Sequence, residues 1–196
     1  MTSPGNARGR GTLLLKASAF VVGPRDGAGA ALADLARAQG FSPVGRYAGL
    51  GKAERQTDET PLVFFLCAEV ADIETLKPMA DAIRFSESRK LRFSPLIYFA
   101  RALSADSIRR CIRMGFDDVI ALPYGRGDLA ERIGRQVGRL HVYTETSTYF
   151  GPDRRDHAVA RPGSDADSDG QFRRIEIMRN PDTGIDVLQD DLQVVL

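Results

Sequence analysis

Short apolar runs recur along the first part of this chain and predict buried strands. The clearest run covers residues 61–67 (PLVFFLC), and its unbroken apolar character is typical of a strand covered on both faces of a parallel sheet. Four further runs of this kind span residues 12–22, 44–48, 95–100 and 118–122. Because the runs are short and Gly or Pro follows several of them, we predict five strands.

Between these runs the apolar residues recur every three or four positions, which predicts amphipathic helices. The predicted helices cover residues 28–39, 72–84, 104–114 and 128–142. The polar stretch 49–60 has the charge density of a solvated loop or of an irregular helix. Strands that alternate with helices in this way predict an α/β fold with a doubly wound, five-stranded parallel sheet.

Beyond residue 143 the pattern changes. Residues 144–171 are dominated by Gly, Pro, Ser, Asp and Arg, which cannot bury a core, so they are predicted to form a linker that is mobile unless a partner holds it. Residues 172–179 and 185–188 alternate apolar and polar side chains around the turn sequence NPDTG, which predicts a small β-hairpin packed on the domain or on another chain. The expected organisation is a disordered start, one α/β domain and a C-terminal extension, over residues 1–11, 12–142 and 143–196.

Composition narrows the classes of partner. The 27 basic and 26 acidic side chains leave a net charge of +1, so no general attraction for nucleic acid or for an anionic membrane is expected. The extension also lacks a helix-turn-helix pattern, and we expect no DNA binding. Without a signal peptide or an apolar run long enough for a bilayer, a cytoplasmic protein is expected. Cys67 and Cys111 lie in apolar segments without CxxC spacing, which predicts buried, reduced thiols.

Residues 115–124 (GFDDVIALPY) resemble, nearly position by position, the receiver segment Gly-Ala-Asp-Asp-Tyr-Leu-Xaa-Lys-Pro-Phe. Residues 62–67 and 95–101 are similar to the receiver strands that carry the phosphoacceptor aspartate and the switch hydroxyl. On these segments, residues 15–142 resemble the CheY-like receiver domains of two-component response regulators. The resemblance implies a flavodoxin/CheY-like fold and, in an active receiver, an aspartate that accepts a phosphoryl group beside a bound Mg²⁺.

The positions that carry receiver chemistry hold unsuitable residues in this sequence. The acidic pair, the acceptor, the hydroxyl and the lysine fall on Gly23, Pro24, Leu66, Ala100 and Leu122. Leucine has no oxygen that attacks phosphorus, and neither Gly nor Pro offers a side-chain ligand to a hard cation. Asp26 lies two residues beyond the expected acidic pair and Glu69 three beyond the expected acceptor, but a shift of both strands to use them would move the apolar faces out of register.

The resemblance therefore implies a degenerate receiver that is not an enzyme and needs no cofactor. Its expected function is signal transduction by protein–protein interaction that does not depend on phosphorylation. The expected partner is another signalling protein or a second copy of this chain, bound through the side formed by the fourth and fifth receiver helices.

Two arginine pairs in the extension give an alternative function. The pattern Gly-Xaa-Xaa-Arg-Arg occurs twice, each time beside a phenylalanine, and its candidate binding residues are Phe150, Arg154, Arg155, Phe172, Arg173 and Arg174. Paired guanidinium groups suit bidentate binding of phosphate, and aromatic faces suit stacking, so an anionic ligand such as cyclic di-GMP is the alternative. The first pair resembles Gly-Pro-Asp-Arg-Arg extensions of some bacterial receiver-like proteins, whereas the second element of the PilZ motif is not found.

Residues 165–176 (DADSDGQFRRIE) match the formula of a calcium loop. The ligand positions fall on Asp165, Asp167, Asp169 and Glu176. The context argues against an ion, because Pro162 and Gly163 block an entering helix and two arginines lie within the loop. An acidic, solvated turn is the favoured interpretation, and no metal site is predicted.

Overall fold

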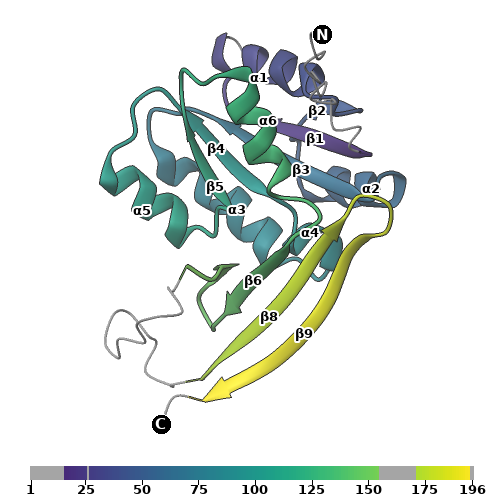
Figure 1. Ribbon diagram of the computed structural model, residues 1–196. Coiled ribbons are helices and arrows are strands. Elements are labelled where there is room, and N and C mark those ends of the chain that lie inside the picture. The colour runs from purple at the N-terminus through teal and green to yellow at the C-terminus, as the bar shows by residue number, and fades with distance from the viewer. Residues whose placement is uncertain (1–15, 26, 155–170, 195–196) are drawn as a thin grey trace, which may run out of the picture.

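The computed structural model describes residues 16–25, 27–154 and 171–194, which form two sheets with flanking helices (Figure 1). The first sheet has five parallel strands in the order β2-β1-β3-β4-β5. These strands are β1 (Ala17–Val22), β2 (Val44–Arg46), β3 (Leu62–Ala68), β4 (Leu96–Ala100) and β5 (Asp118–Ala121). This is the predicted doubly wound α/β sheet, with the strand order of flavodoxin/CheY-like folds. Residues 1–15, which include the predicted disordered start, lie outside the described part.

The helices cover both faces of this sheet. They are α1 (Gly27–Ala38), α2 (Leu50–Glu59), the 3-10 helix η1 (Ile73–Leu76), α3 (Lys77–Arg84), α4 (Arg89–Arg92), α5 (Ala105–Arg113) and α6 (Arg126–Gly134). α1 and α6 pack on one face, and the other helices pack on the opposite face. Residues 49–60, for which the sequence leaves loop and helix open, contain α2. Within the described part of the chain, no helix has the length and apolar character needed to cross a membrane.

β3 lies at the centre of the sheet, as predicted, and all seven of its residues are buried. Its side chains alternate between two apolar cores, so that Phe64 and Leu66 face α1 and α6 while Phe65 and Cys67 face the other helices. Cys67 and Cys111 are free and buried in the same core, in agreement with the sequence. Burial raises the pKa of the Cys111 thiol to about 12, so this thiol stays protonated at neutral pH.

The last predicted helix is wrong over its second half. α6 ends at Gly134, and the strand β6 (Leu140–Glu145) begins inside the segment predicted as helix. Gly138 lies between the two elements with a φ of 67°, in the left-handed region that favours glycine, and its N–H donates to the carbonyl oxygen of Arg179. Leu140, predicted on the buried face of the helix, is 54% exposed.

The second sheet is antiparallel, in the order β7-β6-β8-β9. Its other strands are β7 (Phe150–Pro152), β8 (Gln171–Asn180) and β9 (Gly184–Val194). The predicted hairpin is present with its predicted turn, but β8 and β9 have 10 and 11 residues and pair with two earlier strands. The prediction of a linker over residues 144–171 is therefore wrong where β6 and β7 form, and residues 155–170 lie outside the described part.

The second sheet packs against the amino ends of the parallel strands (Figure 1). A third small core joins the two parts, with Phe93, Tyr143, Phe150, Ile175 and Ile177 as its buried members. Phe93 belongs to the segment just before β4, and Lys16, just before β1, forms an ion pair of 3.0 Å with Asp182 in the β8–β9 turn. Of the two packing alternatives left open by the sequence, the hairpin packs on the α/β domain.

Candidate functional site

The carboxyl edge of the parallel sheet is the first candidate site, because ligands of open α/β sheets bind in the crevice outside the carboxyl ends of the strands. Gly23 directly follows β1 and has a φ of 130°. A Cβ atom added at Gly23 would lie 3.0 Å from the Cβ atom of Ala68 at the end of β3, so the two chain segments are in close contact. Pro24 is exposed beside them. Arg46 of β2 donates to the carbonyl oxygens of Gly23 and Pro24, so the polar groups at this edge are backbone carbonyls and one guanidinium group, without a carboxylate at the two aligned positions.

The structure does not bring all five receiver positions to one surface. Leu66 lies inside β3, pairs in register with Val21 and Ile97, and is 1% exposed. Ala68, two residues further along the same face, is the β3 residue nearest the rim. Ala100 is buried in the core on the opposite face of the sheet, so the aligned acceptor and hydroxyl positions do not face each other.

A crevice of about 420 Å³ lies between α1 and the strand ends. α1 contributes Ala28, Ala31 and Leu35, and the strand ends contribute Ala68, Phe99 and Leu122. The small side chains of α1 leave this space open, and its size is in the range of small-molecule pockets. The strand side of the crevice is formed by the carboxyl ends of β3, β4 and β5, and most of its wall is hydrocarbon.

Charged and polar groups are confined to the rim of the crevice. The carboxylate of Glu69 accepts hydrogen bonds from the backbone N–H and from Nε of Arg101, both at 3.3 Å. The Arg101 side chain is 82% exposed, so this ion pair is solvated and weak. Burial raises the pKa of Tyr124, the third polar residue of the lining. Among the described residues no group of three His, Cys, Asp or Glu side chains could hold a metal ion, and Asp26 lies outside the described part.

The arginines of the extension have partners within the chain. Arg173 donates from Nε and Nη2 to Asp190 and from Nη1 to Glu145, and Arg174 forms an ion pair of 2.5 Å with Glu176. Because carboxylates of the same sheet already neutralise these two guanidinium groups, an anionic ligand would have to displace them. The Glu176 carboxylate, predicted as the last ligand of the calcium loop, is likewise held by Arg174.

The other predicted binding residues are dispersed. Arg154 donates from Nη2 to the carbonyl oxygens of Phe116 and Asp117, both at 2.9 Å. Phe150 is buried in the core between the sheets, where no base can stack on it, and Phe172 is half-buried on β8. The predicted residues outside the described part are Arg155, Asp165, Asp167 and Asp169.

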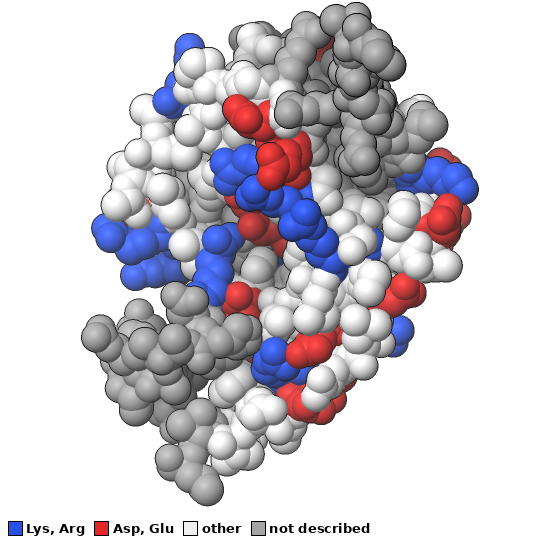
Figure 2. Space-filling model, in the orientation of Figure 1, with Lys and Arg blue, Asp and Glu red and all other residues white. Residues whose placement is uncertain are grey.

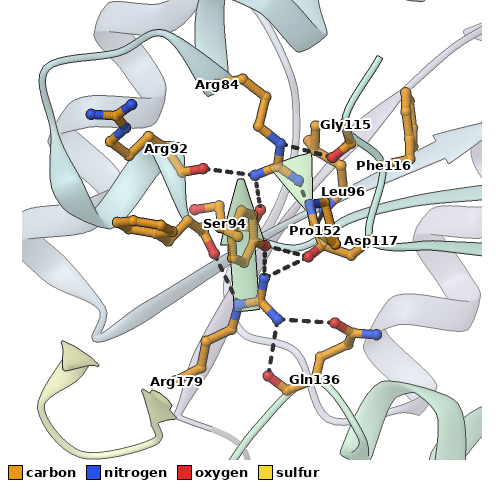
Figure 3. Close-up of polar contacts among 12 residues, drawn as sticks. Arg84, Arg92, Ser94, Leu96, Gly115, Phe116, Asp117, Gln136, Pro152 and Arg179 are labelled. Atoms are coloured by element: carbon orange, nitrogen blue, oxygen red, sulfur yellow. Dashed lines mark hydrogen bonds and ion pairs between the residues drawn. The ribbon is translucent and has the colours of Figure 1, made fainter. Parts of the chain in front are cut away.

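A buried cluster of charged residues at the opposite, amino edge is the feature that sequence reasoning missed (Figure 3). Its centre is Asp117, in the turn just before β5. Arg84, the last residue of α3, donates to one carboxylate oxygen at 2.6 Å, and Arg179 of β8 donates to the other at 2.6 Å. Both arginine side chains are almost completely buried. The two guanidinium groups approach Asp117 from opposite sides, one from each part of the molecule.

The remaining donors of the cluster are also satisfied. Arg84 donates hydrogen bonds to carbonyl oxygens in the segments that lead into β4 and β5. Arg179 donates hydrogen bonds to carbonyl oxygens in the segments before β4 and after α6. These acceptors are the carbonyl oxygens of Arg92, Ser94, Gly115, Phe93 and Gln136. The Tyr143 hydroxyl donates to Asp117 and accepts from Arg179, and the N–H of Leu96 donates to Asp117 at 2.8 Å. The cluster thus fixes the turns at the amino ends of two parallel strands.

The electrostatics of the cluster favour the charged carboxylate. Burial alone raises the pKa of Asp117, but the guanidinium groups of Arg179 and Arg84 outweigh it and hold this pKa well below its usual range. Burial raises the pKa of Tyr143, so its hydroxyl stays protonated and remains a donor. Asp117 and Tyr143 therefore keep fixed protonation states near neutral pH, which suits a structural joint and does not suit acid–base catalysis.

Comparisons with known proteins identify no family. No protein-family model, no curated protein and no solved structure matches the chain. The assignment of the fold rests on the structure alone. Five parallel strands in the order β2-β1-β3-β4-β5, with helices on both faces, are consistent with a flavodoxin/CheY-like fold.

Proposed function

We propose that this chain is a signal-transduction module that acts by binding another protein and not by phosphotransfer. The observation that carries the proposal is the hydrocarbon lining of the carboxyl edge, where a receiver holds its acceptor and its Mg²⁺. Gly23, Ala68 and Leu122 offer neither a nucleophile nor a metal ligand there. The likeness of residues 115–124 to the receiver segment, together with the strand order, supports signalling as the setting.

The docking surface that we propose is the face formed by α5, β5 and α6. Ile108 on α5 is an apolar side chain with 37% exposure, and Arg109 and Arg113 are exposed on the same helix. Figure 2 shows basic side chains gathered over α5. Arg109 is 4.0 Å from Asp106, too far for a strong ion pair, so its charge is available to a partner. An apolar centre with a basic rim favours a partner surface that is apolar and acidic.

The outer edge of β5 is covered, which favours binding of a partner through side chains of this face and not through strand addition. β5 is the last strand of its sheet, and Arg132 of α6 lies across its outer side. Arg132 forms an ion pair with Asp118 and donates to the carbonyl oxygen of Val119 at 3.1 Å. Because Arg132 occupies a backbone acceptor of this edge, an added strand is disfavoured, and the exposed side chains of α5 remain for a partner.

The first experiment tests the absence of phosphotransfer. The full chain is incubated with acetyl phosphate and Mg²⁺ beside an active receiver, which verifies the phosphodonor, and both are analysed by intact-mass spectrometry. We expect the mass of this chain to stay unchanged, because the aligned acceptor is a buried leucine. A stable gain of one phosphoryl group would overturn the proposal.

The second experiment tests the docking face. The full chain with the paired substitutions Ile108→Asp and Arg109→Glu is compared with wild type by cross-linking in the native host. Arg37→Glu is the matched control, since Arg37 is an exposed arginine on α1, which is not one of the three elements of this face. We expect one discrete cross-linked protein with wild type and with the control, and its loss with the α5 variant. A product that survives in the α5 variant, or no product at all, contradicts the proposed surface.

A further inference from the structure

The free edge of the second sheet carries a feature that the proposed function does not use. β9 is the outermost strand and pairs only with β8 among the described residues. Its first residues pack on the α/β domain, where Ile185 and Val187 contact the buried core. The far end of β9 extends past the α/β domain (Figure 1). Among the described residues no strand pairs with the outer side of β9, so this side can receive another strand.

The same part of β9 exposes large apolar side chains. Six large hydrophobic residues are exposed in the described chain, and three of them are Leu188, Leu192 and Val194, with exposures of 53%, 68% and 55%. The strand contains no proline and no basic residue, which are two of the common devices that protect an edge strand. Its register against β8 shifts at Leu188, which has no partner in register, so the regular part of this edge is residues 189–194. The edge therefore combines open backbone groups with apolar side chains, as in sites where an extended segment adds to a sheet.

Charge decides which occupant fits this edge. β9 carries Asp186, Asp190 and Asp191 and no cation. Asp190 is paired with Arg173, whereas the contacts of Asp186 are with Asn180 and Thr183, and that of Asp191 is with Gln189. Acidic side chains recur along the edge in Figure 2. Antiparallel pairing of two copies along β9 would bring carboxylates of both chains together, which disfavours a second copy and favours a basic segment.

We propose that residues 188–194 of β9 bind an extended, basic segment of a partner protein, which joins the second sheet as an additional strand. Backbone hydrogen bonds supply the pairing, the exposed leucines and valine supply apolar contact, and the carboxylate of Asp191, which contacts the neutral side chain of Gln189, selects positive charge. The β9 edge belongs to the antiparallel sheet, whereas the α5–β5–α6 face belongs to the parallel sheet. The inference therefore goes beyond the proposed function and does not depend on it.

The test uses a fluorescein-labelled decapeptide of alternating valine and arginine as the probe, with fluorescence anisotropy as the readout. We expect the full chain to bind this peptide at least about tenfold more tightly than the matching valine–glutamate peptide. Methylation of alternate backbone nitrogens should abolish binding, because the methylated peptide cannot donate to the edge. Amide hydrogen exchange of residues 188–194 should slow when the basic peptide is present.

Matched variants separate this edge from general electrostatic attraction. Asp191→Lys should weaken binding at least about tenfold, whereas Asp34→Lys, which changes an exposed aspartate of α1, should leave it unchanged. Equal binding of the methylated peptide, or protection that appears on α5 and not on β9, would overturn the proposal. Sedimentation of wild type as a dimer that Asp191→Lys dissociates would assign the edge to a second copy, and it would overturn the proposal as well.

Discussion

The two ends of the parallel sheet are built from opposite chemistry. At the carboxyl end, Ala68, Phe99 and Leu122 line a crevice of hydrocarbon. At the amino end, Asp117 is buried between Arg84 and Arg179. Open α/β sheets place their ligands at carboxyl ends, so polar groups are expected there. In this molecule the buried charges lie at the amino end and connect the α/β domain to the second sheet. A buried ion pair in such a fold can therefore join two parts of the structure and need not belong to a reactive site.

The largest effect should come from a carboxylate placed inside the hydrocarbon end. Because Leu66 is 1% exposed and lies within β3, Leu66→Asp buries an unpaired charge. We expect the free energy of unfolding, measured by urea denaturation, to fall by more than about 4 kcal/mol. The control is Leu122→Asp, where the half-exposed rim lets water reach the carboxylate, and there we expect a loss below about 2 kcal/mol. Equal losses would contradict the interior position of Leu66.

Removal of charge at the amino end should have the next largest effect. Asp117→Ala leaves the guanidinium groups of Arg84 and Arg179 buried without a counter-charge. We expect a loss of about 3–5 kcal/mol in the same urea measurement. Asp182→Ala removes the exposed partner of Lys16 and should cost about 1 kcal/mol or less. If the two variants lose similar stability, the cluster is not the joint between the two parts.

Removal of the Tyr143 hydroxyl from the cluster should lower the free energy of unfolding by a smaller amount. Tyr143→Phe removes the donor to Asp117 but keeps the ring in the core between the sheets. We expect a loss of about 1–2 kcal/mol, since one buried hydrogen bond to a charged group disappears. Tyr124→Phe at the crevice rim is the matched control and should change the free energy of unfolding by less than about 0.5 kcal/mol. A larger loss for Tyr124→Phe would reverse the assignment of the two ends.

A different effect, which appears only on acidification, is a dependence of stability on pH from His141, on the inner face of β6. Burial, assisted by the charge of Arg179, lowers the pKa of His141 from 6.5 to about 4. The unfolded chain therefore takes up a proton below pH 6.5 that the folded chain takes up only near pH 4, so stability falls as pH decreases through this window. The pKa of Asp117 is lowered from 3.8, so its contribution is lost only at still lower pH.

The measurement is a series of urea denaturations from pH 7 to pH 4. His141→Gln has no group that titrates in this range, and its stability should change less with pH than that of wild type. A wild-type curve as flat as that of the variant would show that His141 is not desolvated in the folded state.

The parallel sheet could be predicted because each of its strands has a local signature. The run at residues 61–67 is apolar on both faces, and β3 is buried on both faces. The end of α6 could not be predicted in the same way. Val137 and Leu140 follow Ile133 at helical spacing, but Leu140 belongs to a strand whose partner, β8, starts at residue 171. When a segment fits both the helical and the strand periodicity, its conformation is decided by pairing with residues far along the chain.

The candidate sites show the same limit. Gly23 and Leu122 could be placed at the carboxyl edge from the strand ends, whereas Leu66 lies two residues too deep because the alignment does not fix where β3 ends. The charged cluster has no local signal at all. Asp117 and Arg179 are 62 residues apart, and each stands in a segment where a charged residue is ordinarily solvated. Only the contact between the two sheets makes them a pair.

The separation of Asp117 from Arg179 also orders events during synthesis. A ribosome releases the α/β strands well before it releases β8, so a nascent chain carries Asp117 and Arg84 while their third charged partner has not yet been made. Before Arg179 is synthesised, water must form the hydrogen bonds that Arg179 later makes with the Tyr143 hydroxyl and with one carboxylate oxygen of Asp117. Co-translational proteolysis of stalled chains should therefore cut near β6 readily, and this sensitivity should end once residue 179 leaves the exit tunnel.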